Sequence, residues 1–260
     1  MPIQPLEPRR LYRQIADQLR GLILAGEWPL GGRLPAERDL AAQLGVSRPS
    51  VREALIALEV EGLVAVRMGS GIEVVARAPS AQAPPVDGYF GPFEIIRARQ
   101  LVECELAAQA ALSMDAAAMQ GLRQALACMA DDMARSLAPI RGDRQFHLRI
   151  AEAAGNGPLL RTVTELFDER NNPLFEQLGH HFETPPSWGL ALAEHQAVIE
   201  AIAAGDAGAA RAAMHQHLQQ SHDRFAGTWA QPPPAVPPGS TLLCAPPATP
   251  SFAKSTASKP

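Results

Sequence analysis

The sequence contains four residues whose types and spacing are suited to binding a metal ion. Asp143 and His147 are four residues apart in GDRQFHLRI (142–150), a segment with the apolar spacing of an amphipathic helix. His195 and His217 follow in Ala-rich segments that also have helical spacing. One carboxylate and three imidazoles suit zinc, nickel, manganese or iron better than calcium. The alternatives are that the histidines are hydrogen-bonded core residues and that Asp143 is the N-cap of its helix.

Arg48 and Arg52 form a second group of residues whose types and spacing could have a function, here contact with DNA. They are four residues apart near the start of a predicted helix (47–62), where Ser47 is placed to be the N-cap and Pro49 falls in the first turn. Arginines at this end of a helix can contact guanine edges in the major groove of DNA, and serine hydroxyls can contact phosphates. Any helix pair with surface arginines would show the same pattern, so the pattern alone is weakly specific.

The elements that would position these arginines lie in the first part of the chain. A helical segment (36–44), a turn at Gly45 and the helix 47–62 form a helix-turn-helix pattern, which another helical segment precedes. The segment LVAVRMGSGIEVV (63–75) alternates apolar and polar residues around GSG, which predicts a two-stranded hairpin, or wing. We therefore expect a winged helix-turn-helix domain at residues 1–76.

The remainder of the chain is predicted to be helical, so the expected fold class is mainly α. Residues 77–91 are rich in proline and aperiodic, as is typical of a linker. Residues 92–226 keep helical spacing and are predicted to form an all-α helical bundle of about six helices. Residues 227–260, rich in proline and nearly without charge, are predicted to be a disordered tail. The breaks between the bundle helices fall near 113–115, 139–143, 155–158, 183–188 and 204–207.

Composition and charge narrow the class of protein. The chain is 47% hydrophobic and 19% charged, like ordinary globular proteins, and it has neither an apolar run of membrane-spanning length nor a signal-peptide pattern. We therefore expect a cytoplasmic protein that does not contact a membrane. The formal net charge of −4 argues weakly against binding nucleic acid. However, residues 1–76 are neutral, with nine Arg and nine acidic residues, whereas residues 77–225 carry a net charge of −6.

The first 76 residues resemble the winged-helix domain of the GntR family of bacterial transcription regulators. The resemblance covers residues 9–76, and LPAERDLAAQLGVSRPSVREAL (34–55) is its most specific part. It implies a dimer that binds a short palindromic DNA operator. One departure is GIEVV, where Glu73 follows the wing in place of the usual aromatic residue. By position, the resemblance implies DNA contacts from Arg38, Arg48 and Arg52, help with phosphates from Ser47 and Ser50, and a wing tip at Met68 and Gly69.

The helical remainder resembles the FadR-type subfamily, which has an all-helical, metal-binding effector domain. The phrases FEIIRARQLVECELAAQAA, DRQFHLRIAEAAGNGPL and EHQAVIEAIAAGDAGAARAAMHQHL carry this resemblance, over roughly residues 92–222. A mixed α/β effector domain would need strands, and none are predicted in these residues. A long aminotransferase-like domain would not fit in the remaining residues. The resemblance implies that Asp143, His147, His195 and His217 are the ligands of a divalent metal, for which we expect zinc, with nickel, manganese or iron as alternatives.

Several residues near this set keep an alternative interpretation. His215 and His222 are rivals for the last ligand position. Arg99 matches an arginine that the subfamily places near its pocket, where it would bind the carboxylate of an effector. The alternative for Arg99 is a surface helix pair with Glu103, four residues later. His180 and His181 are interpreted as a solvated helix end or a pocket rim, and Trp188 as core or rim packing.

One longer stretch narrows the effector. FDERNNPLFEQLGHHFETPPSWGLALAEHQ (167–196) resembles the branch of hexuronate and sugar-acid regulators, which favours a sugar acid over lactate, pyruvate or a fatty acyl thioester. The leading hypothesis is a dimeric, metabolite-responsive repressor, associated with the bacterial nucleoid, that is not an enzyme. Two alternatives are a metalloenzyme carrying a DNA-binding domain, which would turn over a bound acid, and a ligand-independent DNA-binding protein, which would not respond to one.

Overall fold

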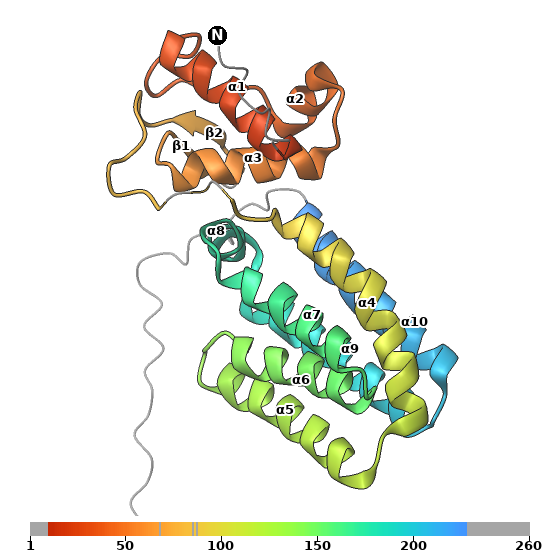
Figure 1. Cartoon of the computed structure of the whole chain (residues 1–260). Coiled ribbons are helices and arrows are strands. Elements are labelled where there is room, and N and C mark those ends of the chain that lie inside the picture. Colours follow the sequence, from red (N-terminus) through yellow and green to blue (C-terminus); the bar gives the residue numbers. More distant parts are fainter. Residues whose placement is uncertain (1–9, 68, 85, 87, 228–260) are drawn as a thin grey trace, which may run out of the picture. The chain divides into compact units, whose positions relative to one another are not determined.

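The computed structural model describes residues 10–67, 69–84, 86 and 88–227. The first part is a winged helix-turn-helix, which runs from red to orange in Figure 1. The predicted helix, turn, helix and hairpin are all present, in the predicted order. The elements are α1 (Leu11–Ala25), α2 (Glu37–Leu44), α3 (Arg48–Val60), β1 (Val64–Arg67) and β2 (Gly71–Val74).

Local sequence explains how α2 and α3 are joined. α2 ends at Gly45, whose φ of 65° lies in the left-handed region that glycine adopts without strain. Ser47 is the N-cap of α3, and its hydroxyl accepts a hydrogen bond from the backbone N–H of Ser50. Pro49 lies in the first turn of α3, where a missing N–H removes no helical hydrogen bond. The cap and the turn therefore fix the point at which α3 begins.

The hairpin completes the domain. β1 and β2 are antiparallel, with Val64 opposite Val74 and Arg67 opposite Gly71. Glu73, which replaces the aromatic residue that the resemblance led us to expect, forms an ion pair with Arg67 at 2.9 Å. Apolar side chains of the hairpin and the helices share one core, which includes Ile15, Leu19, Val51, Leu55, Leu58, Val64, Ile72 and Val74.

The second part is all helical, which confirms the predicted fold class. Among the described residues from β2 to α4 there is neither helix nor strand. The bundle then consists of α4 (Pro92–Ser113), α5 (Ala116–Ala134), α6 (Ile140–Ala153), α7 (Gly157–Asp168), the 3-10 turn η1 (Glu169–Asn171), α8 (Pro173–Phe182), α9 (Pro185–Ala203) and α10 (Ala207–Ala226).

The break between α7 and α8 was not predicted. Asn172 is the N-cap of α8, and its side-chain oxygen accepts from the backbone N–H of Phe175 at 2.9 Å. Pro173 follows in the first turn of α8. Asn followed by Pro is a recognised turn signal, but the apolar spacing continues across it and hides the break.

The helices that carry the four predicted ligands surround one interior. α4 packs against α10, α10 against α9, and α6 against both α4 and α5. Alanines on α4, such as Ala107, Ala110 and Ala111, are buried in this interior and leave room for close approach of the neighbouring helices. Phe146, Val198, Met214 and Leu218 fill the core around the ligands.

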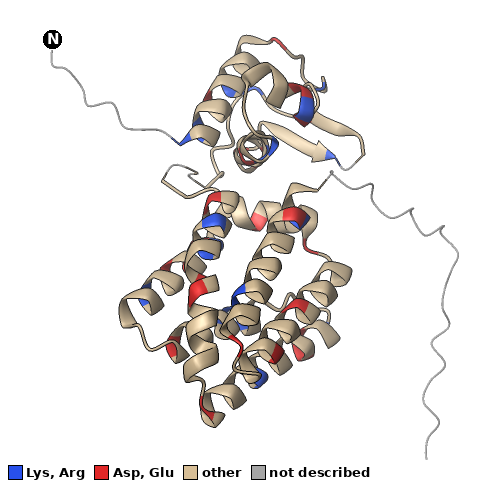
Figure 2. Cartoon of the chain, turned by 90° about the vertical axis from the view of Figure 1, so that its right-hand side faces the viewer, with Lys and Arg blue, Asp and Glu red and all other residues tan. Residues whose placement is uncertain are grey.

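The described part of the chain contains no helix that is long and apolar enough to cross a membrane. Acidic and basic residues are interspersed along the helices and are not separated by sign (Figure 2). Met68 and residues 228–260, which include nearly all of the predicted tail, lie outside the described residues.

Candidate metal centre and DNA-binding helix

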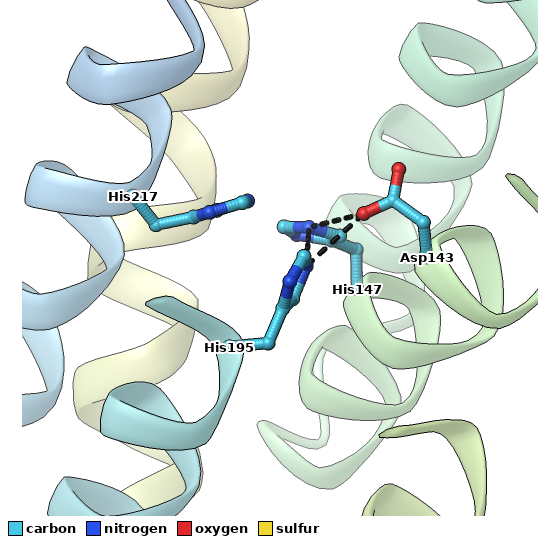
Figure 3. Close-up of side chains that lie close together, drawn as sticks. All are labelled: Asp143, His147, His195 and His217. Atoms are coloured by element: carbon cyan, nitrogen blue, oxygen red, sulfur yellow. Dashed lines mark hydrogen bonds and ion pairs between the residues drawn. The ribbon is translucent and has the colours of Figure 1, made fainter. Parts of the chain in front are cut away.

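The four predicted metal ligands lie together inside the bundle. One ligand atom from each of Asp143, His147, His195 and His217 lies within 4.8 Å of the others. Figure 3 shows Asp143 and His147 extending from α6 towards His195 of α9 and His217 of α10. His147, His195 and His217 are buried, and Asp143 is half-buried. Residues that are far apart in the sequence are thus brought to one point by three helices.

The residue at which α6 begins shows whether Asp143 is the N-cap of that helix. The helix begins at Ile140 with Pro139 as its N-cap, so Asp143 lies in the first turn and is not the cap. Positions i and i+4 share one face of a helix, which places the Asp143 Oδ1 atom 3.5 Å from the His147 Nε2 atom. Gly142 lies on a different face of α6 and allows close approach to α5, because a Cβ atom there would lie 2.6 Å from Cγ of Met129.

His147 is oriented by a buried carboxylate on another helix. Its Nδ1 atom contacts the Oε2 atom of Glu103 on α4. Arg99 binds the other oxygen of the same carboxylate, with 2.6 Å between Nε and Oε1. A carboxylate behind the Nδ1 atom of an imidazole leaves the Nε2 atom available as a metal ligand. The Nε2 atom of His147 indeed lies on the Asp143 side of its ring.

His195 and His217 are oriented in the same way. The Nδ1 atom of His195 lies 2.7 Å from the carbonyl oxygen of Ala191, and that of His217 lies 2.9 Å from Oε2 of Glu194. The Nε2 atom of His195 lies 3.0 Å from Oδ1 of Asp143. All three imidazoles therefore have an acceptor at Nδ1 and can offer Nε2 to one ion. This donor set fits a divalent transition metal.

The charges around the cluster favour the metal-binding protonation state of Asp143 and His217. Burial lowers the pKa of His147, but the Glu103 carboxylate outweighs burial and raises that pKa, which favours the protonated imidazole. Burial alone would raise the pKa of Glu103, but Arg99 and His147 beside it lower that pKa to about 2. Burial likewise opposes ionisation of Asp143, yet Arg170, His147 and His195 hold its pKa well below the ordinary value. Burial, together with the neighbouring His195 and His147, lowers the pKa of His217 well below its ordinary value. Asp143 is thus ionised and His217 neutral, as ligands must be.

A cavity adjoins the cluster. It has a volume of about 70 Å³, which is room for several water molecules. Asp143, His195 and His217 lie in its wall, and so do Arg99 and Trp188. A small molecule in this cavity could therefore contact the ligand residues, a cation and an aromatic ring at once.

Arg99 combines features of both expectations, the pair with Glu103 and the place near a pocket. It forms the i, i+4 pair with Glu103, but the pair is buried and Arg99 is only 3% exposed, so the surface interpretation does not hold. Its guanidinium carbon lies 4.2 Å from the centre of the Phe167 ring. Arg99 therefore combines a structural pairing with a place in the cavity wall.

The other histidines lie outside the cluster. His215 is exposed, and His222 contacts Asp223, with 3.1 Å between Nδ1 and Oδ1. His180 is exposed, whereas the Nε2 atom of His181 lies 2.6 Å from Oε2 of Glu59. Neither rival for the last ligand position, His215 or His222, belongs to the cluster, whereas His217 does.

Three residues of the site were missed by sequence reasoning. Glu103 was considered only as a surface partner, and Glu194 and Arg170 were not considered. Arg170 pairs with Asp143, and one of its nitrogens lies 3.6 Å from Oε1 of Glu183. Glu194 directly precedes His195, which is a weak signal. No sequence signal marks Arg170, because its contact crosses from η1 to α6.

The predicted DNA-binding arginines are placed differently from one another. The side chain of Arg38 is 83% exposed, and that of Arg48 is 46% exposed while its Nε atom lies 3.0 Å from Oε1 of Glu37. Arg52 is 1% exposed, with a nitrogen 2.7 Å from Oε2 of Glu37, and it also donates to the backbone carbonyl of Phe225. Arg38 and Arg48 are thus accessible in this structure, and Arg52 is not.

The remaining predicted DNA contacts lie at the start of α3 and in the turn between β1 and β2. The hydroxyls of Ser47 and Ser50 are 2.9 Å apart at the exposed start of α3. Gly69 lies in the exposed turn of the wing with a φ of 71°, which favours glycine. Met68, its predicted companion, is outside the described residues.

Comparison with known proteins agrees with both parts of the fold. Residues 11–74 match the family described as bacterial regulatory proteins, gntR family, and residues 94–220 match the FCD domain. The chain is 38% identical over 224 residues to the Uxu operon transcriptional regulator of Escherichia coli (strain K12), covering 84% of this chain and 87% of that protein.

Two further relatives from the same strain are similar over nearly the same length. The Exu regulon transcriptional regulator is 37% identical over 228 residues, covering 83% of this chain and 84% of that protein. A regulatory protein whose name refers to an L-lactate dehydrogenase operon is 37% identical over 227 residues, covering 83% and 86%. The chain belongs to the GntR family of DNA-binding bacterial transcription regulators, and its helical part is an FCD domain of the FadR type.

Proposed function

We propose that this regulator is a homodimeric repressor whose helical domain binds a small carboxylic acid, a sugar acid, at a divalent metal site. One observation carries the proposal. Asp143 and the imidazoles of His195 and His217 lie in the wall of the same cavity as the buried guanidinium of Arg99. A cavity that combines metal ligands with a cation is suited to an anionic molecule that also has coordinating oxygens.

The residues of this chain would share the work of holding the ion and the acid. Asp143, His147, His195 and His217 would bind the metal, with zinc as the best match to one carboxylate and three nitrogens. When bound, the ion supplies coordination positions for a carboxylate or hydroxyl oxygen. Arg99 would add a charge-assisted contact to the acid, while its pairing with Glu103 keeps it in place.

A sugar acid is favoured over a shorter acid. Residues 167–196 resemble the branch of hexuronate and sugar-acid regulators, and two similar proteins are named for the Uxu operon and the Exu regulon. Another similar protein is named for an L-lactate dehydrogenase operon, so lactate is the comparison that the experiment must include. We place the regulator on operator DNA in the bacterial cytoplasm, acting as a regulator and not as an enzyme.

The DNA contacts would come from the start of α3 and from the wing. Arg38 and Arg48 are accessible and would contact bases or phosphates, Ser47 and Ser50 would contact phosphates, and Gly69 would bring the wing to the backbone. Arg52 would join them after leaving Glu37. A homodimer would place two such helices on the two halves of a palindromic operator.

The test is a melting screen of the metal-loaded protein against D-glucuronate, other hexuronates, aldonates, L-lactate, pyruvate and dicarboxylates, repeated after chelation. A ligand that binds only the folded state at ~100-fold excess over Kd stabilises it by about 2.7 kcal/mol. We expect stabilisation by a sugar acid that disappears with the metal, and weaker operator binding in its presence. Stabilisation by none of these acids, with the metal bound, would contradict the proposed effector class.

The same screen separates the metal from the acid. Measured metal content near one ion per chain, with His195→Ala reduced to near zero, is the expected result. A protein that binds an acid equally well after chelation would contradict the metal-dependent site, even if the acid were a hexuronate.

A further inference from the structure

Asp143 is the most exposed of the four candidate metal ligands. Its side chain is 15% exposed, whereas those of His147, His195 and His217 are at most 5% exposed. A metal site that is buried in a folded domain needs an entry path that reaches its ligands. The protein around Asp143 is therefore the first place in which an entry path is expected.

Two spaces lie next to each other on this side of the bundle. The cavity beside the ligands, here called the inner cavity, has a volume of about 70 Å³. A larger space, here called the outer hollow, has a volume of about 640 Å³ and includes Gly179 and His180 of α8 in its wall. Four residues line both spaces and form a shared wall between them: Ile140, Arg170, Glu183 and Trp188.

The inner cavity is too small to hold a sugar acid by itself. Sites for small molecules usually have volumes of roughly 300–1,000 Å³, several times the volume of the inner cavity. The outer hollow has a volume within that range. An acid that binds at the metal therefore needs room beyond the inner cavity, and the outer hollow can supply it once the shared wall opens.

The contact between Arg170 and Glu183 is a weak point of the shared wall. The nearest nitrogen and oxygen atoms of the two side chains are 3.6 Å apart, which is longer than a hydrogen bond. The two side chains are 17% and 28% exposed. An ion pair that is long and partly exposed contributes little to stability, so this pair can separate at low cost.

Glu183 is the member of this pair that is held less firmly. Arg170 also pairs with Asp143, and its guanidinium carbon lies 5.1 Å and 5.5 Å from the ring centres of Phe167 and Phe175. Glu183 lies in the connection between α8 and α9, and among the described residues its side chain forms an ion pair only with Arg170. Separation of the pair would therefore move Glu183 and leave Arg170 on Asp143.

We propose that the shared wall is the entrance to the metal centre, and that it opens when Glu183 separates from Arg170 while Arg170 stays on Asp143. Divalent ions and small acids then pass from the outer hollow into the inner cavity. The proposal rests on the proposed function, because it needs a metal at the four ligands.

Leu192 marks a rival entrance. It lines the inner cavity and also a third space, which has a volume of about 400 Å³. Leu192 packs against the apolar core of the bundle, so an opening there would expose apolar surface to water. We therefore expect the wall at Leu192 to stay closed, and Leu192→Ala tests this expectation.

The test measures Co²⁺ uptake and release by the full-length protein. Uptake is followed by the visible absorption of the bound ion after rapid mixing, and release is followed after addition of excess EDTA. Glu183→Ala removes one member of the ion pair. Glu176→Ala is the matched control, because Glu176 lines the outer hollow and not the inner cavity. Melting temperatures show whether each variant is folded.

We expect Glu183→Ala to accelerate Co²⁺ uptake and release by the same factor, about twofold to fivefold, and to leave the dissociation constant unchanged. Loss of a negative charge would by itself slow the approach of a cation, so faster uptake reports an easier opening of the wall. Glu176→Ala should accelerate neither step.

Gly179→Leu is designed to have the opposite effect. A Cβ atom at Gly179 would lie 3.6 Å from the carboxyl carbon of Glu183, which is an ordinary contact. The larger side chain would therefore fill the outer hollow beside the shared wall without displacing the backbone. We expect it to slow Co²⁺ uptake and release together.

Other outcomes separate the entrance from the metal site. Wild-type rates in both Glu183→Ala and Gly179→Leu would show that the shared wall is not the entrance, while the proposed metal site stands. Faster exchange in Leu192→Ala alone would place the entrance at the third space. A change in release without a change in uptake would show that Glu183 acts on the bound ion, which also overturns the proposal. If the wild type binds neither Co²⁺ nor Zn²⁺, the proposed function and the proposed entrance both fail.

Discussion

The buried charges of the helical domain and those of the winged helix are arranged in different ways. In the bundle, Asp143 and three imidazoles face one another, and each imidazole has an acceptor behind it on a neighbouring turn or helix. In the winged helix, Glu37 of α2 forms ion pairs with Arg48 and Arg52 of α3. The candidate metal ligands of the bundle are thus held in position by contacts within the protein. The proposed DNA-binding helix holds Arg48 and Arg52 in an internal pairing with Glu37 that bound DNA would have to replace.

Two buried glutamates show how neighbouring groups determine the pKa of a buried carboxyl group. Glu103 in α4 lies beside Arg99 and His147, which overcome burial and lower its pKa to about 2. Glu53 in α3 is bonded to the backbone N–H of Phe93, and burial raises its pKa to about 7. Glu103 can therefore serve as a charged support for His147, whereas Glu53 is protonated below about pH 7 and loses its proton near that pH.

The largest expected effect comes from removing one of the four candidate metal ligands. His195→Ala deletes one of four donors, and we expect metal affinity to fall roughly a hundredfold to a thousandfold, since structural zinc sites share ~10–16 kcal/mol among their ligands. Metal content and operator binding with and without D-glucuronate measure the result. DNA binding should persist but no longer respond to the acid. His215→Ala, an exposed histidine on the same helix as His217, is the control. Retained metal stoichiometry in His195→Ala would move the site elsewhere.

The second prediction concerns the pH dependence of Glu53. Its pKa is raised from 4.5 to about 7 in the folded protein, so the folded state keeps a proton that the unfolded state loses between these values. The free energy of unfolding should therefore fall as pH rises from about 4.5 to about 7, by on the order of 3 kcal/mol. Glu53→Gln cannot titrate and should be more stable than the wild type at pH 8, with a smaller difference at pH 5.

Thermal melting of the two proteins across this range measures the effect. Glu165→Gln removes an exposed carboxylate of α7 that is not among the groups that shift the pKa of Glu53, and it should leave the pH dependence of the wild type unchanged. A constant difference between Glu53→Gln and the wild type at all pH values would show that Glu53 has an ordinary pKa.

The third prediction tests whether Arg48 can contact DNA despite its ion pair with Glu37. Arg48→Ala should weaken binding to a specific operator by about 1–3 kcal/mol while leaving the melting temperature within a few degrees of the wild type. Fluorescence anisotropy with operator and with unrelated DNA measures the loss of specificity. Arg211→Ala removes an exposed arginine of α10 that pairs with Glu105, and it should bind the operator as the wild type does. Wild-type operator affinity in Arg48→Ala would contradict the assigned contact.

The smallest expected effect comes from a single methyl group. Gly142→Ala would place a Cβ atom 2.6 Å from Met129 Cγ and 2.8 Å from the Ala125 carbonyl oxygen, so α5 and α6 would have to separate. We expect a loss of about 1–2 kcal/mol in stability and weaker metal binding, because Asp143 is the next residue. Gly189→Ala is the control, since nothing lies within 4 Å of its Cβ position. Equal stability of the two variants would show that the α5–α6 contact is not tight.

Sequence reasoning reached the parts of the site that depend on local spacing. The i, i+4 relation of Asp143 and His147, the cap at Ser47 and the hairpin follow from short-range rules, and the resemblance supplied His195 and His217. The partners behind the ligands did not follow, because Glu103 meets His147 only through the packing of α4 on α6. The burial of Arg52 depends in the same way on Glu37, fifteen residues earlier, and the break at Asn172 was masked by continuous apolar spacing.

Glu194 of α9 binds two residues of α10, His217 and Arg224, which are two turns apart. One side chain therefore fixes both the rotation and the axial position of α10. A slide of one residue, roughly 1.5 Å along the axis, would strain both contacts together and could not be absorbed by either alone. The two contacts therefore hold α10 in one register against α9.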